Sequence, residues 1–380
     1  MEDPGLLRPD RERLVSTFSR LAQVDSPSRG EGALARLLVD ELGRLGWAVF
    51  DDGSGPDCGN VIATLPGDAA LEPLMFTSHM DVVMPCLGVR PRLEDGVFSS
   101  SGDTVLGADA KASVAALLEL AQLLASDATA NLRRPPLELV FTWGEEVGHL
   151  GGRALDVGGV RARRAYVLDG LTPVGTIIIA APTYQAFTVR VIGRAAHAGV
   201  EPERGISAIV VAAQAVSRLP WGRLDESTTA NIGTITGGSV RNAVAAEARL
   251  DGEVRSLVTG RAAAVAQDIR ETFEAVAASA GAGAEFELVR GYAGYELDRN
   301  APLVELAGSA FAGLSRGGQS RLLRTGGGSD ANELNERGIV ACVLGIGAEG
   351  CHSVDERISV DELERLSEWV LAIADRAAAG

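Results

Sequence analysis

Four short segments, far apart in the chain, each end an apolar run typical of a buried β-strand with an acidic residue or a histidine. A fifth segment, which contains a histidine, lies near the C-terminus. The five segments are residues 77–81, 107–111, 144–146, 166–169 and 350–353. Only four histidines occur in the 380 residues, and two of them, His79 and His352, lie in these segments. Histidines and carboxylates gathered at strand ends are the ligands that a pair of divalent cations needs.

The charge balance argues against several classes of partner. A formal net charge of −16 opposes binding to nucleic acid and to anionic membrane surfaces, both of which are negative. Residues 1–5 lack the basic start of a signal peptide, and no apolar run approaches the roughly 20 residues of a transmembrane helix. The four cysteines are scattered without CxxC spacing, which favours reduced thiols. We therefore expect a cytoplasmic protein that does not bind membranes or nucleic acid.

Apolar runs alternate with helical patterns in the first half of the chain. Helical periodicity is seen over residues 10–45, and an alanine-rich helix is predicted over residues 110–124. Strands are predicted at residues 61–65, 74–77, 137–142 and 165–168. This alternation indicates an α/β fold with helices on both faces of a sheet. Ligands of such sheets gather at the carboxyl ends of strands, where the acidic segments fall.

The pattern changes near residue 182 and changes back near residue 292. Between these points the predicted order is β-α-β-β-α-β, which is typical of a small α+β layer of ferredoxin-like type. The chain length also favours more than one domain. We predict a metal-binding domain formed by residues 1–181 and 293–380, with residues 182–292 as an inserted domain. The first domain would end in an amphipathic helix over residues 360–378.

Each acidic segment has an ordinary structural explanation when it is taken alone. His79 fits a core histidine, with Asp81 two residues later as the partner that orients its ring. Asp109 fits a helix N-cap, and Asp169 followed by Gly170 fits a turn. The Glu145-Glu146 pair fits a solvated turn, and His352 a loop. Cys351 fits a thiol nucleophile or a metal ligand, although the nearby carboxylates already account for a metal. It is the placement of all of them at strand ends that indicates a metal site.

The ordered set of motifs resembles a known family. The chain is similar to the co-catalytic two-zinc metallopeptidases related to carboxypeptidase G, aminoacylase and peptidase T, and most similar to the peptidase T-like branch. The matching segments, in the order of the family, are Ser78-His79-Met80-Asp81, Gly107-Ala108-Asp109-Ala110-Lys111, Gly144-Glu145-Glu146-Val147-Gly148, Leu168-Asp169-Gly170, Gly193-Arg194-Ala195-Ala196-His197-Ala198-Gly199, Gly326-Gly327-Gly328-Ser329-Asp330-Ala331-Asn332 and Cys351-His352-Ser353. The resemblance covers nearly the whole chain. It implies a catalytic domain with a mixed sheet flanked by helices, and an inserted domain used for dimerisation and as a lid.

The resemblance also implies roles for the metal-site residues. Asp109 would bridge two metal ions, most simply zinc, although imidazole and carboxylate also accept manganese or cobalt. Glu145 would be the general base for a water between the metals. The remaining ligands would be His79 and Asp169 at one metal, and Glu146 and His352 at the other.

Further roles follow for residues outside the metal site. His197 would reach the partner subunit's active site in a homodimer and help to hold the oxyanion. Asn242 and Arg324 are candidate substrate contacts, the arginine for a carboxylate terminus; a turn residue and a surface charge are the ordinary alternatives. His149 matches no metal position of the family, which leaves a structural, solvent-facing or supporting role. Ala110 departs from the family, where Asp, Asn or Met is common.

The expected function is hydrolysis of short peptides by a tripeptidase or aminopeptidase. Asp169 favours cleavage from a free amino end, because carboxypeptidase-like relatives carry Glu there. The alternatives are an N-acyl-amino-acid amidohydrolase or a carboxypeptidase with the same metal site. A catalytically silent scaffold is disfavoured, since all five ligands and Glu145 are present. The glycine-rich residues 326–328 lack a nucleotide-binding motif and would instead close over a substrate.

Overall fold

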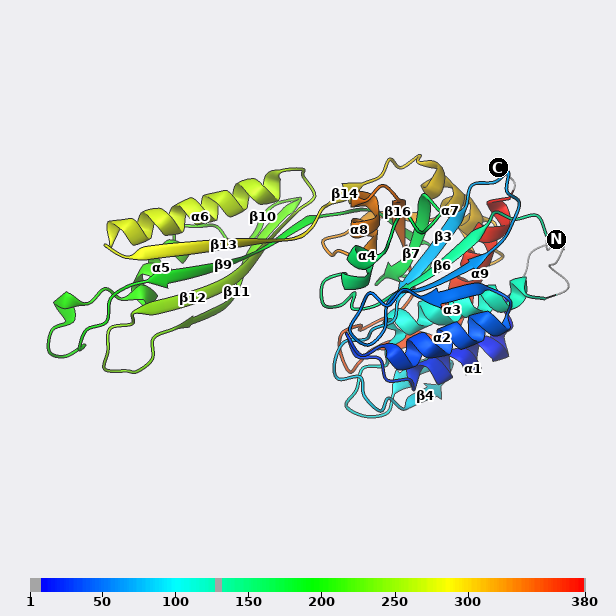
Figure 1. Cartoon of the computed structure of the whole chain (residues 1–380), viewed down its shortest axis with the longest axis horizontal. Helices are drawn as coiled ribbons and strands as arrows, with labels where there is room; N and C mark the ends of the chain where they lie inside the picture. The colour runs from blue at the N-terminus through cyan, green and yellow to red at the C-terminus, as the bar shows by residue number, and fades with distance from the viewer. Residues whose placement is uncertain (1–7, 127–131, 379–380) are drawn as a thin grey trace. The chain divides into compact units, whose positions relative to one another are not determined.

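The computed structural model describes residues 8–126 and 132–378, which divide into two compact units (Figure 1). Unit 1 is built from Met1–Ala180, Leu297–Arg324 and Ser329–Gly380, and unit 2 from Ala181–Glu296 and Thr325–Gly328. The acidic N-terminus considered above, residues 1–5, lies outside the described residues. Within the described ranges, no helix is both long enough and apolar enough to cross a membrane.

Unit 1 contains a large mixed sheet. Its strands follow the order β1-β2-β6-β3-β7-β16-β8, with β15 also paired to β8. The central strands β6, β3, β7 and β16 run parallel, and β1 and β2 run antiparallel to their neighbours. Strand β8 is antiparallel to β16 and parallel to β15. The strands are β1 (Ala48–Asp51), β2 (Val61–Leu65), β3 (Leu74–His79), β6 (Leu137–Thr142), β7 (Arg164–Gly170), β8 (Thr176–Ala181), β15 (Arg321–Arg324) and β16 (Val340–Gly345). The predicted α/β fold is thereby confirmed.

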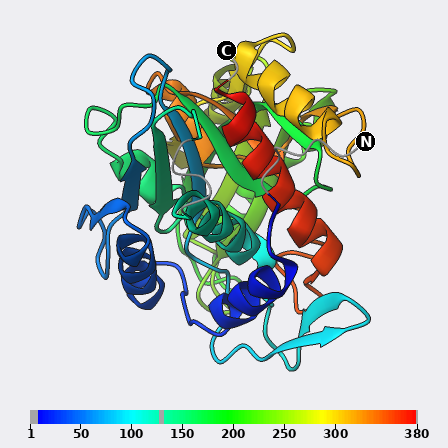
Figure 2. The same ribbon diagram turned by 90° about the vertical axis from the view of Figure 1, so that its right-hand side faces the viewer.

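Helices cover both faces of this sheet. Helix α3 contacts β3 and β7 and packs against α1 and α9, and α9 lies beside α3 in Figure 2. On the other side, α8 contacts β16 and α4 contacts β6. The helices of unit 1 are α1 (Arg11–Ala22), α2 (Gly32–Arg44), α3 (Ala108–Leu124), α4 (Leu150–Ala154), α7 (Pro302–Ala312), α8 (Asp330–Glu336) and α9 (Val360–Arg376). Apolar side chains such as Phe76, Leu117 and Trp369 are fully buried between these layers.

A small antiparallel sheet connects the end of the chain to an early hairpin. It has the order β17-β5-β4, with Ile358 of β17 opposite Phe98 of β5. Its strands are β4 (Pro91–Glu94), β5 (Val97–Ser100) and β17 (Arg357–Ser359). This pairing anchors the loop that contains His352, because β17 begins five residues after that histidine.

Unit 2 is an antiparallel sheet packed against two helices. The strand order is β10-β11-β12-β9-β13, and α5 and α6 contact both β9 and β12. The elements are β9 (Thr183–Ile192), a 3-10 turn (Pro202–Arg204), α5 (Ala208–Val216), β10 (Gly222–Asp225), β11 (Thr228–Gly237), β12 (Glu247–Ser256), α6 (Arg261–Ser279), β13 (Gly283–Tyr292) and β14 (Tyr295–Glu296). Apart from the short β10 and β14, this is the β-α-β-β-α-β order predicted from the sequence.

Three boundaries differ from the sequence-based assignment. Ala181, residues 293–296 and Thr325–Gly328 belong to unit 2, although the sequence places them in the metal-binding domain. The reason for the difference at Thr325–Gly328 is a contact between distant residues. Arg255 donates hydrogen bonds to the carbonyl oxygen of Gly326 at 3.2 Å and to the hydroxyl of Tyr292 at 3.1 Å. The glycine-rich loop is therefore held by the inserted unit.

Candidate metal centre

The five predicted ligands meet at one edge of the large sheet of unit 1. His79 is the last residue of β3, and Asp169 lies near the end of the parallel neighbour β7. Asp109 stands at the start of α3, Glu146 follows β6, and His352 precedes β17. Parallel strands end at a common edge, so residues far apart in the sequence come together there.

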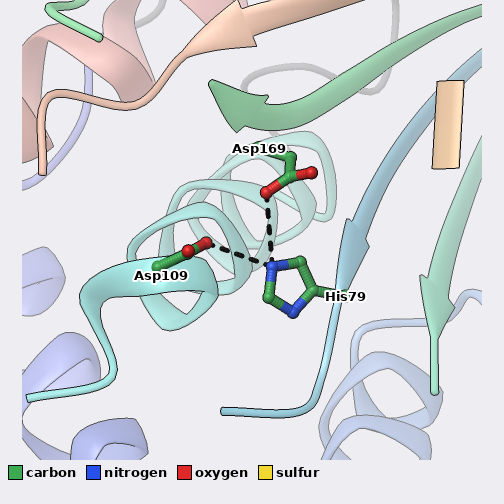
Figure 3. A group of neighbouring side chains, drawn as sticks. All are labelled: His79, Asp109 and Asp169. Carbon is green, nitrogen blue, oxygen red and sulfur yellow. Dashed lines mark hydrogen bonds and ion pairs between the residues drawn. The ribbon is translucent and has the colours of Figure 1, made fainter. Parts of the chain in front are cut away.

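His79, Asp109 and Asp169 form the first group (Figure 3). The Nε2 atom of His79 lies 3.1 Å from Oδ1 of Asp109 and 3.4 Å from Oδ1 of Asp169. Figure 3 shows both carboxylates, carried by α3 and β7, directed at the same ring nitrogen of His79. One nitrogen and two oxygens are thus within reach of a single cation.

Asp109, Glu146 and His352 form a second group that shares Asp109 with the first. The Nε2 atom of His352 lies 3.0 Å from Oε1 of Glu146 and 3.3 Å from Oδ2 of Asp109. Asp109 therefore presents Oδ1 to one imidazole and Oδ2 to the other. A carboxylate with one oxygen in each of two histidine-containing groups has the arrangement of a bridging ligand.

The charges of these side chains fit divalent cations. Burial, with repulsion from Asp109 and Glu146, raises the pKa of Asp169 to about 7, against its favourable contact with His79. Burial opposes ionisation of Asp109, but hydrogen bonds to His352 and His79 prevail and lower its pKa to about 2. The contacts with Asp109 and Glu146 raise the pKa of His352 to about 10. The buried carboxylates are in excess and leave a negative charge, which divalent cations neutralise.

Asp81 connects His79 to the turn that carries Glu145 and Glu146. Its backbone oxygen lies 2.9 Å from Nδ1 of His79, while its carboxylate lies 3.5 Å from that atom. The carboxylate accepts hydrogen bonds from the backbone amides of Glu145 and Glu146 at 2.9 and 3.2 Å, and from the hydroxyl of Ser28 at 2.7 Å. The nearer partner of the His79 ring is thus the Asp81 carbonyl, whereas the Asp81 carboxylate chiefly holds the turn.

Glu356 holds the backbone at Asp109. Its carboxylate accepts hydrogen bonds from the amides of Gly107 at 2.6 Å and Asp109 at 3.0 Å. Gly107 has a φ of 74°, where a side chain would be strained, and a Cβ there would lie 3.2 Å from Val82. The peptide bond between Asp109 and Ala110 is cis. Nothing in the sequence pattern singles out Glu356, because an isolated glutamate has no characteristic spacing.

His352 is presented by a tight turn. Gly350 and His352 both adopt positive φ, 64° and 63°, which is uncommon for a residue with a side chain. The neighbouring Cys351 is partly buried, and burial together with the negative charge of Asp109 raises the pKa of its thiol well above the usual value. A neutral thiol is a poor nucleophile, which argues against Cys351 as a catalytic nucleophile.

Glu145 lies next to both groups. One of its oxygens is within 4.8 Å of ligand atoms of His79 and Glu146. Burial and repulsion from Asp169 raise the pKa of Glu145 well above its usual value. A buried carboxyl group with a raised pKa beside a metal site is suited to accept and return a proton near neutral pH.

His149 lies behind Glu145. Its Nε2 atom is 3.3 Å from Oε1 of Glu145, and its Nδ1 atom is 3.6 Å from Oε1 of Glu333. The residue is 5% exposed, so a solvent-facing role, one of those considered from the sequence, is wrong. Glu333 was not selected from the sequence, because only the fold brings α8 to His149.

His197 and Asn242 lie together in unit 2. The amide of Ala198 donates to the carbonyl of Asn242 at 3.0 Å, and His197 forms an isolated bridge with Ala243. Both side chains are exposed on adjoining loops. Arg324 is exposed at the end of β15 in unit 1. His197 and Asn242 therefore belong to one unit, and the five clustered residues and Arg324 to the other.

Known proteins resemble this chain over nearly its whole length. Residues 75–376 match the family described as Peptidase family M20/M25/M40. Protein YqjE of Bacillus subtilis (strain 168) is 40% identical over 373 residues, 97% of this chain and 99% of that protein. Two solved structures each cover 98% of this chain and 100% of their own. These are aminopeptidase PepT of Bacillus cereus, with 38% identity and a TM-score of 0.91, and a tripeptidase of Staphylococcus aureus, with 34% identity and a TM-score of 0.94.

The family match and the sequence identities support one conclusion. The match covers most of the chain, and it includes every residue of the two groups that share Asp109. The chain belongs to peptidase family M20/M25/M40, in the peptidase T-like branch of its metallo-exopeptidases.

Proposed function

We propose that this protein is a two-metal exopeptidase that removes residues from the free amino end of short peptides, as a tripeptidase or aminopeptidase. The observation that carries the proposal is Asp109, whose two oxygens face the imidazoles of two different groups. The two similar solved structures are an aminopeptidase and a tripeptidase, which supports the same activity for this chain.

His79 and Asp169 would hold one cation, Glu146 and His352 the other, and Asp109 both. Zinc is the ion that we propose, since it favours imidazole and carboxylate ligands. Two such cations, when bound, supply a polarised scissile carbonyl and a water of lowered pKa. Asp81 contributes by fixing His79 and the backbone of Glu146.

Glu145 is the proposed general base. The attacking water loses one proton to the Glu145 carboxylate as its oxygen bonds to the peptide carbon. The same carboxyl then gives that proton to the leaving amine nitrogen, which departs as the C–N bond breaks. The raised pKa of Glu145 suits this cycle, because the group has to be protonated for part of every turnover.

The remaining predicted contacts belong to substrate binding and assembly. We propose that the chain forms a homodimer through unit 2, and that His197 stabilises the oxyanion in the partner subunit's site. Asn242 and Arg324 would bind the peptide, with Arg324 paired to its terminal carboxylate. All four cysteines are free, which supports a cytoplasmic location.

A comparison of two substrates tests the proposal. Zinc-reconstituted protein would be given one tripeptide with a free amino end and the same tripeptide with an acetylated amino end. Zinc-dependent cleavage of the free peptide alone is expected, and a chelator should abolish it. Cleavage of only the acetylated peptide would reject the aminopeptidase assignment in favour of an acylase or carboxypeptidase. The control is Glu145→Gln, which should keep its zinc and lose turnover.

A further inference from the structure

His149 immediately precedes helix α4, at its N-cap position. Its backbone is left-handed, with a φ of 55°, and its side chain is buried against Glu145. The amide of His149 also donates to the carbonyl of Glu145 at 2.8 Å, which fixes the spacing between the two residues. The imidazole therefore approaches Oε1 of Glu145 from a backbone that is itself tied to Glu145.

The other side of the ring faces a second carboxylate. Oε1 of Glu333, on α8, lies 3.6 Å from Nδ1 of His149. The same oxygen accepts a hydrogen bond from Nε of Arg153, on α4, at 3.1 Å. Arg153 thus fixes Glu333, whose carboxylate lies beside the imidazole.

Close packing of α4 on α8 makes this arrangement possible. A Cβ atom on Gly152 would lie 2.4 Å from Oδ1 of Asp330 and 3.4 Å from Cβ of Glu333. Only glycine permits that approach. Asp330 is anchored in turn by the hydroxyl of Thr142, which donates to its Oδ2 at 2.5 Å. The carboxylate of Glu333 is thereby carried by a helix, α8, whose position is fixed.

We propose that His149 is a positioning residue for the general base, and that the chain Arg153–Glu333–His149 holds Glu145 Oε1 so that its second oxygen is free to take the proton of the attacking water. This inference rests on the proposed function, in which Glu145 is the base. Glu145 lies among other carboxylates, so without a fixed donor its side chain would turn away from Asp169 and Glu146. The catalytic consequence is a lower kcat, since a misplaced base costs rate and not binding.

Two substitutions separate positioning from packing. A glutamine amide nitrogen can take the place of Nε2, the atom nearest Glu145, whereas an asparagine amide nitrogen can take the place of Nδ1, the atom nearest Glu333. Both variants remove the imidazole ring. Asparagine tolerates the left-handed backbone at this position, so the Asn variant should fold.

The measurement is kcat, KM and zinc content of wild type, His149→Asn and His149→Gln, on whichever tripeptide the wild type cleaves. Zinc content and KM should stay within about twofold of wild type. The kcat of His149→Asn should fall about 100-fold, and His149→Gln should recover at least about tenfold of that loss. An unchanged kcat in His149→Asn, an equal fall in both variants, or loss of zinc in either would overturn the positioning role alone. A wild type that cleaves neither the free nor the acetylated peptide would instead overturn the proposed function, and this inference with it.

Discussion

Asp109 is the residue on which both groups of donors depend, and Glu356 holds its backbone. Replacing Glu356 with Gln should weaken zinc binding about 10–100-fold, because one backbone amide would then face an amide N–H instead of an acceptor oxygen. Competition with a chromogenic chelator measures the affinity. The matched control is Glu349→Gln, an exposed glutamate of the same loop that pairs with Arg357. Equal affinities in the two variants would contradict the role of Glu356.

Protons and metal ions compete for the same donor atoms. In the metal-free protein the pKa is about 10 for His352 and about 7 for Asp169, and a metal binds only the deprotonated forms. Apparent zinc affinity should therefore fall as the pH drops below 10, and fall more steeply below pH 7, where Asp169 also gains a proton. Calorimetry in buffers of different ionisation enthalpy would count the protons released. A proton count that stays constant through pH 7 would contradict this expectation.

The residues of the candidate site were predictable to different degrees. His79, Asp169 and Glu146 could be selected because each lies at or just after the end of an apolar strand, and their order matches a family pattern. The separate roles of the Asp81 carbonyl and carboxylate could not be predicted, since they depend on where the chain turns. Glu356 and Glu333 act through contacts with backbone or side chains distant in the sequence, and no local spacing indicates such contacts.

Helix α8 is important for the surroundings of Glu145 because it carries both Asp330 and Glu333. Its N-terminus is closed by a capping box, in which Ser329 and Asn332 each bond to the backbone of the other. Such caps matter most in short helices, which cannot offset a frayed first turn by their length. The position of Glu333 beside His149 therefore depends on this cap.

Replacing Ser329 with Ala should lower the free energy of unfolding by about 1 kcal/mol and also lower kcat, because a frayed α8 displaces Glu333. Urea denaturation and peptidase assays measure the two effects. The control is Ser359→Ala, which removes the cap of α9, a helix that carries no residue of the site. It should cost similar stability and leave kcat unchanged. A parallel loss of kcat in both variants would show that stability alone is responsible.

The long, periodic elements were predicted more accurately than the short ones. The helix expected at residues 110–124 is observed as α3, and the strand expected at 137–142 is β6. The sheet formed by β4, β5 and β17 was not predicted. Its strands have three or four residues each, those of β4 are mostly exposed, and β17 pairs across a long stretch of sequence. Neither periodicity nor local turn residues indicate such pairing.

At the scale of the whole molecule, unit 2 contains His197, the proposed oxyanion residue, but none of the five clustered donors. The change of pattern near residues 182 and 292 marks this unit in the sequence. The assignment of Thr325–Gly328 to it does not follow from the sequence, because the hydrogen bond from Arg255 to Gly326 joins residues far apart in the chain.

Mixing two inactive variants tests the proposed dimer. If His197 acts in the partner subunit's site, a heterodimer of Glu145→Gln and His197→Ala contains one site with both residues intact. Co-expression should then restore about one quarter of wild-type activity when subunits pair at random. Two different affinity tags would verify that the heterodimer is present. A tagged heterodimer without activity would show that His197 does not act across the dimer.

The donor residues are spread along the chain, so the ribosome synthesises them at different times. Donors of the first group are complete once Asp169 has been synthesised, but the second group waits for His352, near the C-terminus. A nascent chain emerges from its N-terminus and folds by domains. Truncation between Asp169 and His352 would leave Asp109 with one imidazole and an open second group. Loading of both ions would therefore distinguish a finished chain from an interrupted one.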